Sequence, residues 1–143
     1  MTTSPYQTII GLDIGEKRIG VARISTVAKI AEPLEVIETS SQDVTGKIKQ
    51  VINEYQADAV VAGLPRGLDG QETAQTKYCQ DFARQLATEL TVPVYMIDEA
   101  GTSKEADARI GASTNISRDS MAAAILLEDF VYYKNQDLLR VVV

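Results

Sequence analysis

Three segments of the chain carry acidic residues at positions where carboxylates could bind one divalent cation. Asp13 interrupts the apolar run of residues 7–14, where a charged side chain is costly unless something positive meets it. Asp98 and Glu99 end a second apolar run, and Asp119 lies near the start of an apolar helical segment. Carboxylate oxygens are the ligands that suit Mg²⁺ or Mn²⁺. These residue types therefore favour metal-assisted chemistry.

Composition excludes several other kinds of chemistry. The 143 residues include no histidine, so Ser-His-Asp triads, histidine proton shuttles and imidazole metal sites are ruled out. Cys79 is the single cysteine, which excludes an internal disulfide and a cysteine-based zinc cluster. Acid–base or metal chemistry in this chain must therefore use carboxylates.

The order of the predicted elements brings the acids to one edge of a sheet. Hydrophobic periodicity and turn residues predict five strands and four helices in the order β-β-β-α-β-α-β-α-α. The predicted strands are residues 7–14, 19–24, 30–38, 58–63 and 92–97, and the predicted helices are 44–55, 72–90, 102–111 and 118–133. This order predicts an α/β fold, a mixed five-stranded sheet with helices on both faces. Ligand sites in such sheets lie at the carboxyl ends of the strands, where Asp13, Asp98 and Glu99 are expected. Because strand residues alternate between faces, Asp98 and Glu99 cannot both face the site that Asp13 faces.

Each acid also has a purely structural interpretation. The acidic pair at 98–99 could simply end a strand, as such pairs commonly do, and for the pair alone this interpretation is the better supported one. Asp13 could begin a turn before Gly15, and the two readings are about equally supported for this residue alone. Asp119 could complement the dipole at a helix N-terminus, with Ser117 as the cap. Asp119 nevertheless shares a helix face with apolar residues that should pack on the sheet, so its side chain should point toward the sheet edge. The shared location of the acids favours the functional reading.

Basic side chains accompany every candidate acid. Positive charge beside a metal site suits a phosphodiester backbone, although each charge alone could be ordinary solvated surface. The loop at residues 63–70 could also offer backbone N–H groups to a phosphate. The candidate nucleic-acid-binding residues are Lys17, Arg18, Arg66, Lys104 and Arg118.

The bulk properties predict a single domain over residues 1–143 in the cytoplasm. The length suits one hydrophobic core, and we find no repeat or linker. The first residues lack the basic and apolar regions of a signal peptide, and no apolar run approaches the length of a membrane span. A net charge of −6 argues against nucleic-acid binding over the whole surface but leaves room for a local basic rim.

Four motifs resemble the YqgF/RuvX family of pre-16S rRNA nucleases and Holliday junction resolvase-like proteins. They occur in the family's order and together span nearly the full chain. The motifs are GLDIGEKRIGVA (11–22), VAGLPRGLDGQE (61–72), DEAGTSKEA (98–106) and RDSMAAAILLEDF (118–130). The chain departs from the family pattern at Ala100, where the family usually has arginine, and at Gly67, where it commonly has a polar amide.

The resemblance implies an RNase H-like fold in which Asp13, Glu99 and Asp119 bind Mg²⁺ or Mn²⁺ and serve as the catalytic acids. The implied activity is divalent-cation-dependent phosphodiester hydrolysis during maturation of the 5′ end of 16S ribosomal RNA. Nucleic acid, most directly a ribosomal RNA precursor and its particle, is the implied partner.

Three alternatives remain at this stage. The chain could be a Holliday junction resolvase that acts on four-way DNA. It could be a non-catalytic RNA-binding module in ribosome biogenesis, given the change at Ala100. An actin-like sugar kinase or ATPase is disfavoured, because Glu16 stands where such enzymes usually have Thr or Ser and because 143 residues cannot supply two domains.

Overall fold

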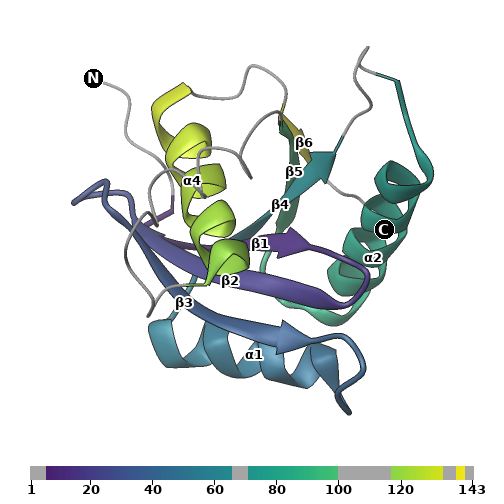
Figure 1. The fold of residues 1–143 in the computed structure, drawn as a ribbon. Coiled ribbons are helices and arrows are strands. Elements are labelled where there is room, and N and C mark those ends of the chain that lie inside the picture. Colours follow the sequence, from purple (N-terminus) through teal and green to yellow (C-terminus); the bar gives the residue numbers. More distant parts are fainter. Residues whose placement is uncertain (1–5, 66–70, 100–116, 134–137, 141–143) are drawn as a thin grey trace.

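A mixed, six-stranded sheet forms the centre of the protein in the computed structural model, which describes residues 6–65, 71–99, 117–133 and 138–140 (Figure 1). The strands lie in the order β3-β2-β1-β4-β5-β6. The elements are β1 (Thr8–Ile14), β2 (Arg18–Ser25), β3 (Ala31–Glu38), α1 (Val44–Tyr55), β4 (Ala59–Pro65), α2 (Ala74–Glu89), β5 (Val94–Glu99), α4 (Arg118–Tyr133) and β6 (Leu138–Arg140).

The directions of the strands confirm the predicted mixed sheet. β1, β2 and β3 form an antiparallel meander. β4 pairs parallel with β1, and β5 pairs parallel with β4, so the carboxyl ends of β1, β4 and β5 share one edge. β6 is a short antiparallel strand beside β5. It lies in the C-terminal tail, whose structure we could not predict from the sequence. The helix predicted over 102–111 lies outside the described residues.

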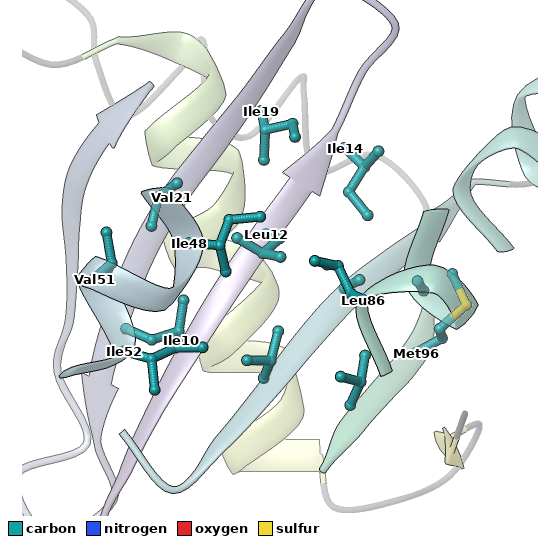
Figure 2. Packing of buried hydrophobic residues seen from close by; sticks show 14 of the residues in the cluster. Ile10, Leu12, Ile14, Ile19, Val21, Ile48, Val51, Ile52, Leu86 and Met96 are labelled. Atoms are coloured by element: carbon teal, nitrogen blue, oxygen red, sulfur yellow. The ribbon is translucent and has the colours of Figure 1, made fainter. Parts of the chain in front are cut away.

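Helices α1 and α2 cover one face of the sheet. The helix predicted over 44–55 is confirmed, and its residues Ile48, Val51 and Ile52 are buried against β1 and β2 in the larger core cluster (Figure 2). Asp43 caps this helix by accepting a hydrogen bond of 3.0 Å from the Gly46 amide.

The buried face of α2 coincides only in part with the row of apolar residues at i+4 spacing, to which the buried Leu86 belongs. Tyr78 and Phe82 belong to the same row, but they are only partly buried and pack against the edge of the core. Cys79 and Ala83 are fully buried in the interface. Small side chains let the helix approach the sheet closely, so the aromatic rings lie at the edge of the interface.

Helix α4 covers the opposite face, so helices on both faces are confirmed (Figure 1). Ala123, Leu126 and Leu127 are buried against β1, β2 and β4 in a second core cluster. Gly11 of β1 makes this close packing possible, because a Cβ there would lie 2.5 Å from Cγ of Leu127. None of the helices in the described part of the chain is long and apolar enough to cross a membrane.

Candidate metal centre

Asp13 lies near the carboxyl end of β1, on the face of the sheet that α4 covers. It pairs with Gly20 of the antiparallel strand β2. Strand alternation gives it the same face as Gly11, which contacts α4. The carboxyl is half-buried, and its pKa is raised from 3.8 to about 6, chiefly by burial and further by the nearby carboxylate of Asp119, while Arg118 acts in the opposite direction. Asp13 is therefore an acid held in a site that disfavours its charge.

Asp119 reaches the same site from the first turn of α4. Ser117 caps the helix, as predicted, by accepting a 3.0 Å hydrogen bond from the Ser120 amide. The turn sits directly on β2 at Gly20, because a Cβ on that glycine would overlap the backbone carbonyl of Asp119. Gly20 thus lets the helix bring Asp119 near Asp13, as their electrostatic interaction indicates.

The backbone register places Glu99 at the same edge. Glu99 pairs with Pro65 at the end of β4, and β4 lies beside β1. Successive residues of a strand alternate between the two faces of the sheet. Position 99 therefore belongs to the same face as Ile97, whose side chain packs in the α4-facing cluster. Position 98 has the parity of Met96, which packs in the cluster under α1 and α2. The structure describes only the backbone of positions 98 and 99, and among the side chains it does describe no group of three metal-ligating residues is found.

The predicted basic residues are distributed unevenly around the acids. Arg18, the first residue of β2, donates from Nε to Oδ2 of Asp119 over 3.1 Å. Arg118 is exposed at the start of α4 and acts electrostatically on Asp13. Lys17 is exposed in the turn between β1 and β2. Arg66 and Lys104 lie outside the described residues.

Side chains from the start of α2 hold the strand ends that flank the acids. The carbonyl of Ile14, next to Asp13, accepts from Nε2 of Gln75 at 3.3 Å and from Sγ of Cys79 at 3.4 Å. The hydroxyl of Thr76 donates to the carbonyl of Pro65 at 2.5 Å. Sequence reasoning identified none of these contacts. The glycines within strands at positions 11 and 20 are signals that could have indicated the close approach of α4 to the sheet.

The donor set fits a hard divalent cation. Asp13 and Asp119 offer carboxylate oxygens from two elements far apart in sequence, and burial keeps Asp13 partly out of water. Like charges brought together in a half-buried site raise each other's energy, and a bound Mg²⁺ or Mn²⁺ would relieve this repulsion. Carboxylates are the ligands that such ions prefer.

The fold matches that of RuvC. The structure of T. thermophilus RuvC in complex with Holliday junction substrate superposes with a TM-score of 0.59 at 20% identity, covering 94% of this chain and 99% of that one. The free Thermus thermophilus RuvC structure gives a TM-score of 0.57 at 18% identity, covering 93% of this chain and 99% of that one. The chain therefore has an RNase H-like fold, as predicted.

Sequence comparison then identifies the family. The family model RuvX, described as Holliday junction resolvase, matches residues 7–133. Two relatives carry the name "Putative pre-16S rRNA nuclease". The protein from Orientia tsutsugamushi (strain Ikeda) is 41% identical over 127 residues, 84% of this chain and 80% of the relative. The protein from Crocosphaera subtropica is 36% identical over 138 residues, which cover 91% of this chain and 96% of the relative. The chain belongs to the RuvX family, which confirms the predicted resemblance and the nuclease class.

Proposed function

We propose that this protein is a divalent-metal-dependent nuclease that hydrolyses a phosphodiester bond of the 16S ribosomal RNA precursor at its 5′ end. The observation that carries the proposal is the convergence of Asp13 and Asp119 at the carboxyl edge of the parallel strands, on the face covered by α4. The names of the relatives support the RNA substrate. The cytoplasmic location remains a prediction from the sequence.

Each acid has a distinct part in this proposal. Asp13, on a strand at the centre of the sheet, would be the central ligand, and Asp119 would be a second ligand from the start of α4. Glu99 would complete the set, because its register position lies at the same edge and has the parity of the α4-facing residues. When bound, Mg²⁺ or Mn²⁺ would supply an activated water and stabilise charge on the leaving oxygen.

The basic residues would bind the phosphate backbone. Arg118 and Lys17 are exposed beside Asp119 and Asp13 in sequence, where they could contact phosphates on either side of the scissile bond. Arg66 and Lys104 are proposed for the same role from the sequence alone. Phosphate contacts position a nucleic acid without reading its sequence, so specificity would have to come from contacts to the bases or from the shape of the nucleic acid.

A second candidate substrate is a four-way DNA junction. It is favoured by the description of the family as Holliday junction resolvase and by the RuvC-like fold. Both reactions break a phosphodiester bond, so the same three acids would serve either substrate. The difference lies in which nucleic acid fits the surface around them.

A cleavage assay with three substrates tests the proposal. Wild type and Asp13→Asn would be incubated at low salt with Mg²⁺ or Mn²⁺ and end-labelled single-stranded RNA, a 16S precursor 5′ fragment or a four-way DNA junction. We expect cleavage of the precursor fragment by wild type and none by the variant. Symmetric nicking of the junction alone would assign the resolvase activity, and failure of folded wild-type protein to cut any substrate would favour a non-catalytic binding module.

A further inference from the structure

We propose that Arg18 is a displaceable counterion of Asp119, which leaves this carboxylate when a metal ion binds and then becomes available to the substrate phosphate. The inference rests on the proposed function of the site. Its starting point is the 3.1 Å ion pair in which Nε of Arg18 donates to Oδ2 of Asp119. The guanidinium occupies a carboxylate oxygen that a metal ion would also use.

The backbone of Arg18 is held in the sheet, whereas its side chain is exposed and can change conformation. Its carbonyl accepts a 2.9 Å hydrogen bond from the amide of Gly15, and its backbone pairs with Glu38 of β3. Arg18 has the same strand parity as Gly20, which meets the first turn of α4. The side chain, however, is 57% exposed. It can therefore swing into solvent without disturbing the sheet.

The ion pair is weak enough for a metal ion to replace. Asp119 is 30% exposed and Arg18 more so, and pairs in contact with water contribute little because solvent screens them. A guanidinium carries only donors, so it cannot share a carboxylate lone pair with a cation, and its positive charge repels a divalent ion. Metal binding and the Arg18–Asp119 pair should therefore compete.

Once released, Arg18 would suit a phosphate contact. The planar guanidinium can donate to two phosphate oxygens at once. Arg18 also lies at the edge of the site, where the reacting phosphodiester would lie. The same side chain would thus neutralise Asp119 before the metal binds and hold the substrate afterwards. Because Arg18 would contact first Asp119 and then the substrate phosphate, metal binding would be linked to substrate binding.

Another arginine on β2 provides a matched control. Arg23 donates from Nε to Oε1 of Glu32 at 2.8 Å, a pair of the same kind on the same strand. Its guanidinium lies 4.6 Å from the ring centroid of Tyr55 in α1, on the other face of the sheet. Lys17 supplies a second control, because Lys17→Gln removes the same charge one residue away from Arg18.

The test is calorimetric titration of Mn²⁺ into wild type, Arg18→Gln, Arg23→Gln and Lys17→Gln without nucleic acid at about 0.1 M salt. We expect Arg18→Gln to bind Mn²⁺ about two- to fivefold more tightly, the range that corresponds to an exposed ion pair. Arg23→Gln should match wild type, and Lys17→Gln should gain less than Arg18→Gln. In the cleavage assay Arg18→Gln should show a raised KM despite its tighter metal binding.

The outcomes separate this inference from the proposed function. Unchanged or weaker Mn²⁺ binding by Arg18→Gln would overturn the inference while leaving the metal site intact. An equal gain in Lys17→Gln would also overturn it, because the effect would then come from overall charge. Absence of Mn²⁺ binding by folded wild-type protein would instead refute the proposed function.

Discussion

Replacing Asp13 with asparagine should stabilise the protein at neutral pH in the presence of EDTA, although it removes the proposed central metal ligand. Burial and the neighbouring Asp119 carboxylate raise the pKa of Asp13 from 3.8 to about 6. At neutral pH the folded protein must therefore hold a charge that its surroundings disfavour. Asparagine fills nearly the same volume without that charge.

The magnitude follows from the linkage between protonation and folding. Because the folded pKa lies above the unfolded value, the folded state binds more protons between pH 4 and 6, and stability falls as pH rises through that window. A difference of about 2 pKa units at about 1.4 kcal/mol each corresponds to about 3 kcal/mol lost by wild type above pH 6. Asp13→Asn lacks this loss, so its advantage over wild type should be near zero at pH 4 and reach up to about 3 kcal/mol at pH 7.

Urea unfolding of both proteins from pH 4 to 8 in EDTA measures this difference. Glu35→Gln, which replaces an exposed carboxylate on β3, is the control and should stay within about 0.5 kcal/mol of wild type. Saturating Mn²⁺ should reduce the advantage of Asp13→Asn, because only wild type retains the central ligand. If Asp13→Asn is equal to or less stable than wild type at pH 7, the carboxylate is not held in a disfavouring site and the reasoning fails.

Three further predictions concern the packing around the site. Gly20→Ala should lower the free energy of unfolding in urea by about 1–3 kcal/mol, because its Cβ would push the first turn of α4 away from β2. The same shift should weaken Mn²⁺ binding in calorimetry, and wild-type metal affinity would contradict this. Gly11→Ala should cost a similar amount but spare Mn²⁺ binding, since it meets the middle of the same helix. Leu126→Ala should lower the free energy of unfolding by about 2–5 kcal/mol in the same assay, because that side chain is buried between α4 and the sheet. A decrease below about 1 kcal/mol would mean that the side chain is not part of the core.

The sequence was most informative where function and folding use local patterns. Alternation and apolar runs located β1, β4 and β5, and the parallel order that followed from them placed Asp13 and Glu99 at one edge. Helical periodicity likewise located α4 and the inward face that carries Asp119. Each element is set by residues close together in the chain, which is why the elements could be predicted without coordinates.

Features set by distant contacts could not be read in this way. The ion pair between Arg18 and Asp119 joins residues 101 positions apart, and no local pattern indicates it. The hydrogen bond from Gln75 to the Ile14 carbonyl depends on how α2 is rotated about its axis, which apolar spacing alone does not determine. β6 is only three residues long and forms by pairing with β5, so its own sequence gives little signal.

The central claim is that Asp13, Glu99 and Asp119 bind one catalytic metal centre. A crystal of the protein grown with saturating Mn²⁺ and measured for anomalous scattering tests it most directly. The account predicts an anomalous peak at the carboxyl ends of β1 and β5 beside the start of α4, with carboxylate oxygens of all three residues as ligands. A peak elsewhere on the molecule, or none at this edge at saturating Mn²⁺, would contradict it.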